Sequence, residues 1–262
     1  MLTSKPTRAL AALALLAAPA AAQEDERPRR TRIGLGPQLV PSYPGSDKIV
    51  LRPFIDVSRA RGDEPFAFEA ADESAGFAVL RSGDFSFGPA INFEGSRTRR
   101  EVGADLPRVG VTVEAGAFVQ YQLSPVIRLR VEGRKGLGGH EGWVGMLGGD
   151  FVTRRGDDYL FSIGPRVTVA DGRYHRAYFG VAPENVAPSG LRAFRPDGGV
   201  QAIGATAGLL HRLTRRWGLT SYVRYDRLVG DAARSPVVRE LGSRNQLSAG
   251  AAATYTFGRT QD

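Results

Sequence analysis

The sequence predicts an all-β protein, a closed antiparallel transmembrane β-barrel of about twelve strands, with ten also possible. Three observations predict it: apolar and polar residues alternate over long segments, short and long connections alternate along the chain, and the 262 residues include 33 glycines and no cysteine. A high share of glycine suits a tightly curved sheet. The lack of cysteine excludes a disulfide framework, a thiolate metal site and a cysteine nucleophile.

The first residues are typical of an export signal. Lys5 and Arg8 precede an apolar run over residues 9–22, and Ala20, Ala21 and Ala22 fit a signal-peptidase site. The run is shorter than the roughly 20 residues that a membrane-spanning helix needs. We expect export to the Gram-negative cell envelope, with a signal peptide over 1–22, a flexible periplasmic spacer over 23–30, an outer-membrane barrel over 31–257 and a C-terminal tail over 258–262.

The alternation has a period of two, which is the period of a β-strand. In one segment Ile127, Leu129 and Val131 alternate with Arg128 and Arg130. Several such segments extend over about ten residues or more, longer than most strands of soluble sheets. Their polar face is rich in glycine and single charges, which favours an apolar outer face and a polar lumen. Aromatic residues near the segment ends would meet the lipid interface: Tyr121, Trp143, Tyr159, Trp217, Tyr255 and Phe257.

The strands predicted in chain order span 31–40, 48–58, 64–70, 76–81, 84–94, 108–122, 125–135, 141–154, 158–170, 198–212, 216–229 and 244–257. The third and fourth have the weakest pattern. The connections on one side are all short, whereas the other side has long ones over 95–107, 171–197 and 230–243. Outer-membrane barrels have short periplasmic turns and longer extracellular loops, so both termini are expected in the periplasm.

Charged residues gather on the predicted inner face. The candidate lumen charges are Arg52, Asp56, Glu94, Glu114, Arg128, Arg130, Glu132, Arg134, Arg166, Arg224 and Asp226. Opposite charges could pair and fill a narrow lumen, because a buried unpaired charge is costly. Alternatively, the arginines could form an eyelet that attracts anionic solutes. Twelve strands allow either arrangement.

The connection over 171–197 is the longest and mixes aromatic residues with arginines. A candidate interaction loop here includes Arg173, Tyr174, Tyr178, Phe179, Arg192 and Phe194. Such a mixture is common at protein interfaces. It would equally suit a loop that folds back into the barrel mouth. This loop is expected outside the cell, whereas a periplasmic partner would meet the spacer and the turns at 59–63, 154–158 and 213–216.

Enzymatic chemistry is not expected. The chain has three histidines, His140, His175 and His211, and none lies in a G-x-S-x-G or H-E-x-x-H motif. A pairing of His175 with Asp171 is the least poor catalytic candidate. No cofactor or metal is expected. The net charge of +8 comes from scattered arginines rather than from a basic block, so lipid headgroups are a more plausible partner than nucleic acid.

Several sequence blocks resemble the MipA/OmpV family of outer-membrane proteins. The first is Tyr43-Pro44-Gly45-Ser46-Asp47, which follows a strand containing Gly34 and Gly36. Others lie, in matching order, at residues 164–166, 170–171, 173–174, 178–181, 189–191, 228–233, 235–237 and 242–246. The chain departs from the usual outer-membrane pattern in that five residues follow the terminal aromatic Phe257.

The resemblance implies a non-enzymatic envelope scaffold, because one family member is regarded as joining a lytic transglycosylase to a murein synthase. Outer-membrane lipid and lipopolysaccharide would surround such a protein. Other members are described as porin-like, so a small channel for polar or anionic solutes is the alternative. A lipid- or lipopolysaccharide-modifying enzyme is a third possibility. No family site residues are carried over.

Overall fold

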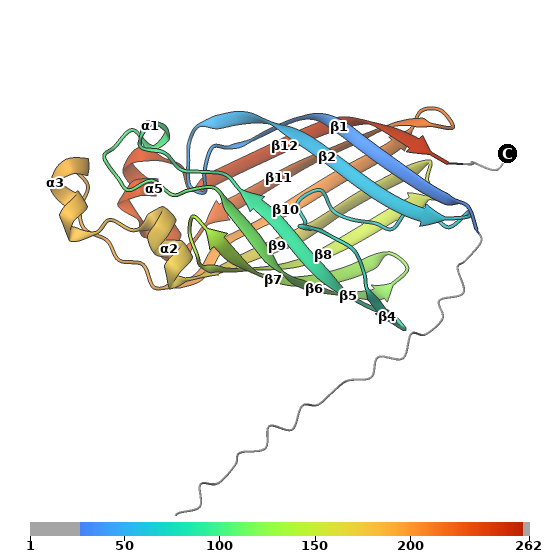
Figure 1. The fold of residues 1–262 in the computed structure, drawn as a ribbon, viewed down its shortest axis with the longest axis horizontal. Coiled ribbons are helices and arrows are strands. Elements are labelled where there is room, and N and C mark those ends of the chain that lie inside the picture. Colours follow the sequence, from blue (N-terminus) through green and yellow to red (C-terminus); the bar gives the residue numbers. More distant parts are fainter. Residues whose placement is uncertain (1–26, 259–262) are drawn as a thin grey trace, which may run out of the picture.

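A computed structural model describes residues 27–258. The predicted signal peptide, residues 23–26 of the spacer and the last four residues of the tail lie outside the described part. The described chain forms a strongly curved antiparallel sheet with helices at one end (Figure 1). Its long strands are β1 (Arg29–Pro41), β2 (Ile49–Arg61), β5 (Phe85–Glu94), β6 (Thr112–Ser124), β7 (Ile127–Gly138), β8 (Trp143–Arg155), β9 (Tyr159–Asp171), β10 (Gly198–Arg212), β11 (Trp217–Leu228) and β12 (Asn245–Phe257). Two short strands, β3 (Ala75–Gly76) and β4 (Leu80–Ser82), complete the sheet.

The strand order shows how the sheet curls. Neighbours in sequence pair from β5 through to β12, and β12 then pairs with β1, for example Phe257 with Thr31. The path ends at β2 on one side and at β3 on the other, and β4 also pairs with β5. Within the described residues no backbone ladder joins β2 to β3, β4 or β5. The prediction of a twelve-stranded antiparallel sheet is confirmed, while its closure is not completed by backbone pairing.

Residues 62–74, here named the inner segment, depart most from the prediction. The predicted strand over 64–70 is wrong, and the one over 76–81 is reduced to β3 and β4. Residues 64–70 of the inner segment lie between two turns and form no strand, and side chains of the wall bind their backbone in place of a neighbouring strand. The Phe66 amide donates to Asp157 at 2.9 Å, the Phe66 carbonyl accepts from Arg154 at 2.9 Å, and the Phe68 carbonyl accepts from Arg128 at 3.1 Å.

The outer face of the sheet is apolar, as the alternation predicts. Leu51, Phe93 and Leu35 are 70%, 69% and 64% exposed. At the end that carries the short turns, the rings of Trp217 and Tyr255 lie 4.9 Å apart and form part of an exposed aromatic cluster. No helix among the described residues is long and apolar enough to cross a membrane.

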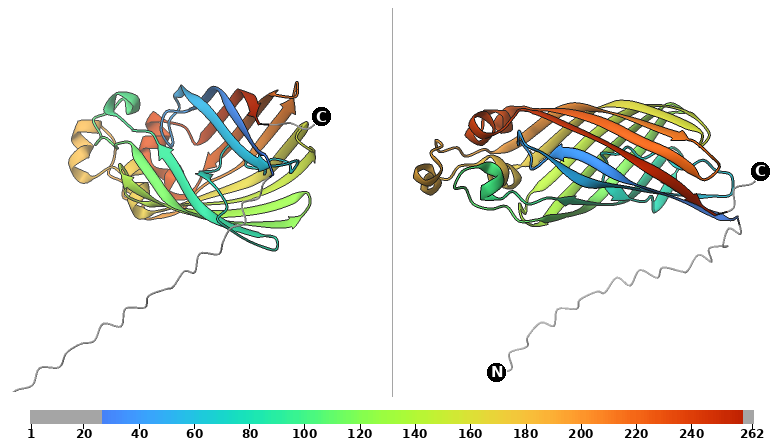
Figure 2. Two further views of the ribbon diagram at one scale, coloured as in Figure 1. Left: turned by 45° about the vertical axis from the view of Figure 1, so that its right-hand side comes forward. Right: turned by 90° about the horizontal axis from the view of Figure 1, so that it is seen from above.

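The long connections form a folded cap rather than irregular loops (Figure 2). The cap contains α1 (Arg99–Val102), α2 (Gly172–Phe179), a 3-10 turn (Pro183–Asn185), α3 (Val186–Ser189), α4 (Gly230–Arg234) and α5 (Pro236–Leu241). Tyr178 and Phe179 of α2 are fully buried against residues of the other loops, including Leu106 and Val237. The predicted strand over 108–122 begins only at Thr112, because Val109 is buried in this cluster and bridges to Arg97 instead.

Candidate functional site

The candidate site is the charged interior of the sheet. The eleven predicted lumen charges lie on the long strands, and Glu114, Arg128, Glu132 and Arg166 are each no more than 2% exposed. The structure brings most of them into ion pairs. It also adds three acidic residues that were not predicted: Asp72 and Glu73 of the inner segment and Asp150 of β8.

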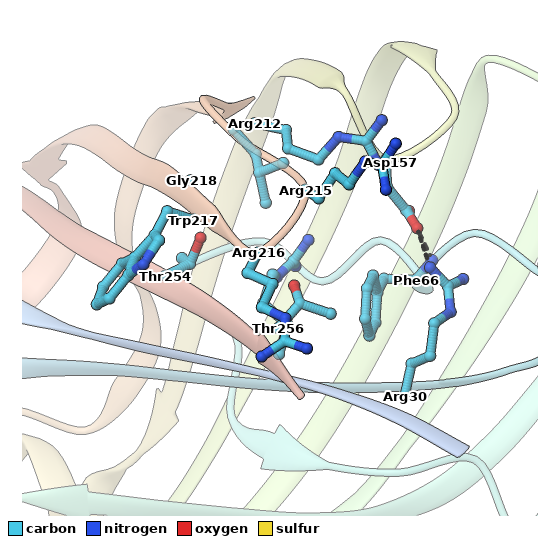
Figure 3. A pocket seen from close by; sticks show the side chains of 12 residues that line it. Arg30, Phe66, Asp157, Arg212, Arg215, Arg216, Trp217, Gly218, Thr254 and Thr256 are labelled. Atoms are coloured by element: carbon cyan, nitrogen blue, oxygen red, sulfur yellow. Dashed lines mark hydrogen bonds and ion pairs between the residues drawn. The ribbon is translucent and has the colours of Figure 1, made fainter. Parts of the chain in front are cut away.

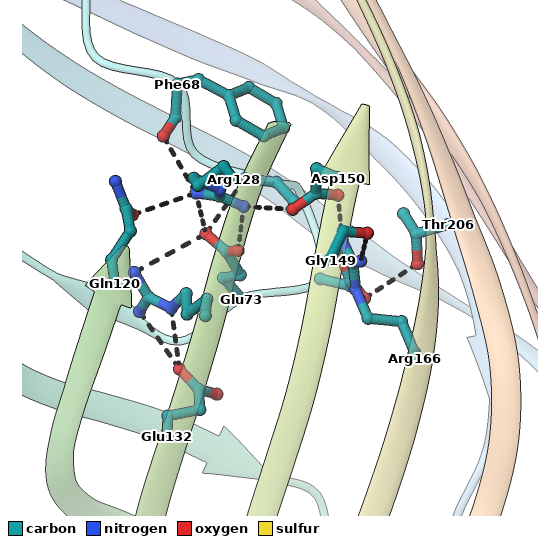
Figure 4. A network of polar contacts seen from close by, with 12 residues as sticks. Phe68, Glu73, Gln120, Arg128, Glu132, Gly149, Asp150, Arg166 and Thr206 are labelled. Atoms are coloured by element: carbon teal, nitrogen blue, oxygen red, sulfur yellow. Dashed lines mark hydrogen bonds and ion pairs between the residues drawn. The ribbon is translucent and has the colours of Figure 1, made fainter. Parts of the chain in front are cut away.

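The first group of ion pairs surrounds Arg128 (Figure 4). Its guanidinium bonds both oxygens of Glu73, with Nη1 at 3.1 Å from Oε2, and also lies 2.6 Å from Asp150. Arg130 lies 3.7 Å from Glu73 and 3.1 Å from Glu132. Glu73 therefore bridges two arginines of β7, and its side chain is only 3% exposed.

The second group surrounds Asp72. Its carboxylate accepts from Arg166 of β9 at 2.8 Å and from the Thr206 hydroxyl of β10 at 2.8 Å. It lies 3.4 Å from Arg224 of β11, which also pairs with Asp226 at 2.5 Å. Arg166 links the two groups through Asp150, at 2.8 Å. The inner segment is thus connected by ion pairs and hydrogen bonds to β7, β9, β10 and β11.

A third group lies nearer the cap. Arg134 bonds Glu114 at 2.9 Å and also pairs with Glu132. His140 Nε2 lies 3.0 Å from Glu114, and His140 Nδ1 accepts from the Gly142 amide at 3.0 Å. His140 is therefore engaged in the wall of the lumen on both ring nitrogens, and its carboxylate neighbour is Glu114 rather than the adjacent Glu141.

The remaining predicted charges lie near β2. The Arg52 guanidinium donates to the Ser42 carbonyl at 2.9 Å, and Asp56 lies 3.7 Å from Arg32 of β1. Glu94 and Arg52 line the same cavity of about 280 Å³, which lies between the ion pairs and the cap. A larger cavity of about 890 Å³ lies toward the short turns.

The end with the short turns, the turn end, holds the beginning of the inner segment. Arg30 of β1 lies 3.1 Å from Asp157 in the turn between β8 and β9 and donates to the Glu64 carbonyl at 2.5 Å. The guanidinium carbon of Arg30 lies 5.0 Å from the centre of the Phe66 ring. A pocket of about 20 Å³ beside these residues is bordered by Arg212, Arg215 and Arg216 (Figure 3).

Half of the residues in the predicted interaction loop belong to the core of the cap. Tyr174, Tyr178 and Phe179 are at most 3% exposed in the cap core, so they are not available to a partner, and their treatment as interface residues is corrected. Their rings form the apolar face of α2, which packs against the other loops of the cap. Of the other members, Arg173 and Arg192 are exposed and Phe194 is half-buried.

The predicted pairing of His175 with Asp171 does not form. The Asp171 carboxylate caps α2 by accepting from the Tyr174 amide at 2.9 Å. His175 is fully buried, and neither ring nitrogen has a hydrogen-bond partner. Burial lowers the pKa of His175, and the negative charges of Asp231 and Asp171 offset this only in part. Among the described residues no group of histidine and acidic side chains could hold a metal ion.

Comparison with known proteins identifies the family. A family model described as MltA-interacting protein MipA matches residues 33–257. The chain belongs to this family. The match covers nearly the whole described sheet and cap, which agrees with the resemblance noted in the sequence. None of the curated proteins compared with this MipA family member matches it in sequence.

Solved structures of several outer-membrane proteins are similar to this MipA family member. A KdgM porin is 9% identical, with 87% of this chain and 99% of that chain covered and a TM-score of 0.38. A NanC porin is 10% identical, with 87% and 98% covered and a TM-score of 0.39. An outer membrane channel from Pseudomonas putida F1 is 10% identical, with 88% and 96% covered and a TM-score of 0.43.

Proposed function

We propose that the protein is an outer-membrane barrel without a steady pore that serves as an envelope scaffold for peptidoglycan-remodelling enzymes. Its outer face supports membrane insertion, because large apolar side chains such as Leu51 and Phe93 are exposed there while the charges lie inside. An exposed apolar surface of this kind would be unfavourable in water. We place the turn end in the periplasm and the cap outside the cell.

The observation that carries the proposal is the inner segment across the lumen. Asp72 and Glu73 neutralise arginines on β7, β9 and β11, so these positive charges, which could attract an anionic solute, are already paired. In the same segment, the ring of Phe66 lies against the guanidinium of Arg30, and the ring of Phe68 lies against the guanidinium of Arg128. A lumen crossed by a segment that pairs with its arginines favours an interaction role over transport.

The family description names MltA as a partner, and a periplasmic enzyme would meet the turn end. Arginines outnumber acidic residues there. The turn-end arginines are Arg27, Arg29, Arg30, Arg59, Arg61, Arg81, Arg154, Arg155, Arg212, Arg215 and Arg216, against Asp63, Glu64, Asp84, Asp157 and Asp158. We propose that this basic rim contacts an acidic surface of the enzyme, which would speed its association.

The test combines conductance with binding. The chain without residues 1–22, refolded into a planar bilayer, is expected to show no steady current. In lipid nanodiscs it is expected to bind purified MltA. Replacing Arg155 and Arg215 by Gln should weaken that binding, whereas replacing Arg173 and Arg192 in the cap should not. A steady pore, or equal weakening by both pairs, would contradict the proposal.

A conditional channel is the second candidate. It is favoured by the absence of any backbone ladder between the inner segment and the long strands within the described residues. Side chains alone hold most of the segment, so its displacement would not break the sheet. The double variant Asp72→Asn, Glu73→Gln should then conduct anions through the exposed arginines, and a silent double variant would count against this candidate.

A further inference from the structure

The interruption of the sheet lies beside a cavity that passes through its wall. β2 pairs with β1 only, and β3 and β4 pair with β5 only. Figure 1 shows β2 and β5 on either side of this opening, with the chain that joins them passing behind it. In a bilayer, unpaired strand edges are unfavourable, because lipid cannot hydrogen-bond to them. The opening therefore needs an occupant or a cover.

The cavity of about 890 Å³ lies at this opening. Ile55 and Val57 of β2 border one side, and Phe77 and Ala78 border the other. These side chains also belong to the outer surface, where Ile55 is 63% and Phe77 66% exposed. The same cavity reaches Thr206 and Thr220 on the opposite inner wall. We name this passage, from the outer surface between β2 and β3–β4 into the lumen, the slot.

The lining of the slot changes along its length. Its apolar or small side chains include Phe54, Ile55, Val57, Phe66, Ala67, Phe68, Ala70, Ala71, Ala75, Phe77 and Ala78. Four acidic residues also border it: Glu69, and Asp56, Glu73 and Asp157, which are in ion pairs with Arg32, Arg128 and Arg30. Toward the turn end the slot is bordered by Arg59 and Arg61 of β2 and, on the other side of the opening, by Arg81 of β4. A passage with apolar side chains at its outer opening and arginines at its turn end matches an amphiphile that has a hydrocarbon chain and an anionic head. The volume falls within the usual range for ligand sites, roughly 300–1,000 Å³.

We propose that the slot binds one acyl chain of an anionic phospholipid from the periplasmic leaflet. The chain enters the wall between β2 and β3–β4, and the phosphate lies beside Arg59 and Arg81 at the turn end. This inference rests on the proposed location in the outer membrane. It goes beyond a general annulus of lipid, because it places hydrocarbon inside the sheet, next to the inner segment.

Phe68 and Phe118 offer a matched pair of reporter positions. Each ring lies against a guanidinium, Arg128 at 4.3 Å from Phe68 and Arg130 at 3.8 Å from Phe118. Both point into the interior, but only Phe68 borders the slot. In a background with Trp143→Phe and Trp217→Phe, which removes both native tryptophans, Phe68→Trp and Phe118→Trp each provide a single fluorophore.

The experiment measures fluorescence quenching in vesicles of phosphatidylglycerol with brominated acyl chains. Phe68→Trp is expected to lose most of its emission, while Phe118→Trp retains most of it. Ala71→Phe, which narrows the slot, should restore emission to Phe68→Trp. Brominated phosphatidylcholine should quench less, and Arg59→Gln with Arg81→Gln should abolish this difference. Equal quenching of the two reporters, no effect of Ala71→Phe, or equal quenching by both lipids would overturn the proposal.

Quenching of the native tryptophans tests the membrane location independently of the slot. Trp143 and Trp217 are 55% and 52% exposed on the outer face, so brominated lipid should quench them whenever the barrel is inserted. Unquenched native tryptophans would contradict the membrane location. Quenched native tryptophans with an unquenched Phe68→Trp would contradict the slot alone.

Discussion

Glu73 of the inner segment and Arg128 of β7 form an ion pair inside the sheet although 55 positions separate them in the chain. Both side chains are at most 3% exposed, and Arg128 also bonds Asp150. The pair ties the inner segment, which joins β2 to β3, to the wall of the curved sheet. It also helps to neutralise two buried charges, because a buried charge without a partner is costly.

Replacing Glu73 should destabilise the fold strongly. Glu73→Ala leaves Arg128 and Arg130 with one fewer carboxylate in a buried site, and loss of one partner of a buried pair typically costs about 3–5 kcal/mol. We expect a lower free energy of unfolding in urea titrations of the protein in vesicles. Glu64→Ala is the control, because Glu64 pairs with Arg27 at the surface and should cost less than about 1 kcal/mol. Similar losses for both would contradict the buried role of Glu73.

The stability of the cap should fall as the medium becomes acidic. His175 is buried with a lowered pKa, whereas in the unfolded chain it takes up a proton near pH 6.5. Below that pH the unfolded state binds more protons, so stability is lost as pH falls, by at most about 1.4 kcal/mol per pH unit for this group. Hydrogen exchange of the cap amides at pH 7 and pH 5 measures the effect.

His175→Phe should remove this pH dependence while keeping the edge contact with Phe179, whose ring lies 5.5 Å away. The gain in cap stability over the native protein should therefore be larger at pH 5 than at pH 7. His211→Gln changes an exposed histidine and should leave the profile as it is. A native-like pH profile in His175→Phe would show that another group is responsible.

Gly164 of β9 lies where the backbone of β8 approaches closely. A Cβ added there would lie 1.6 Å from the Gly149 carbonyl oxygen, so the two strands would have to separate. We expect Gly164→Ala to cost about 1–3 kcal/mol, the usual range for overpacking. Gly133→Ala on β7 is the control, because nothing lies within 4 Å of its added Cβ. The free energies of unfolding in urea should differ accordingly, and equal values would be contrary to this packing.

Ser235 connects two helices of the cap. Its hydroxyl donates to the Phe179 carbonyl at 2.7 Å and accepts from the Val237 amide at 3.1 Å, and it is fully buried. Ser235→Ala should cost about 1–2 kcal/mol, because it removes a helix cap and leaves a buried carbonyl unpaired. Limited proteolysis of the cap should show the change. Ser189→Ala, in the half-buried α3, should be milder, and an equal effect would count against the bridging role.

The alternation in the sequence was sufficient to predict the long strands, because a period of two places apolar residues on the outer face of each. It failed over 64–70 for a physical reason. Phe66, Phe68 and Ala70 alternate with other residues as in a strand, but alternation reports an extended backbone and not its hydrogen-bond partners. Residues 64–70 form no strand, and side chains such as Arg154 bind their carbonyls instead.

The inner face was also only partly predictable. Asp150 has the same parity on β8 as the inward Met146, so the pattern contained the signal that it faces the lumen. Asp72 and Glu73 carried no such signal, since their position depends on the whole path of the chain through the interior. The cap helices were missed for a similar reason, because α2 is stabilised mainly by contacts with other loops.

The pairing of β1 with β12 also governs how the molecule can fold. Thr31 must find Phe257 across nearly the whole length of the chain, so this contact has a very high sequence separation. Such contacts raise contact order and are reached slowly, because loop-closure entropy is lost before they form. Until the last strand arrives, the hairpin of β1 and β2 has no second neighbour and exposes an edge that can aggregate. Assembly of this sheet should therefore depend on a chaperone that covers the hairpin of β1 and β2 until β12 is available to pair with β1.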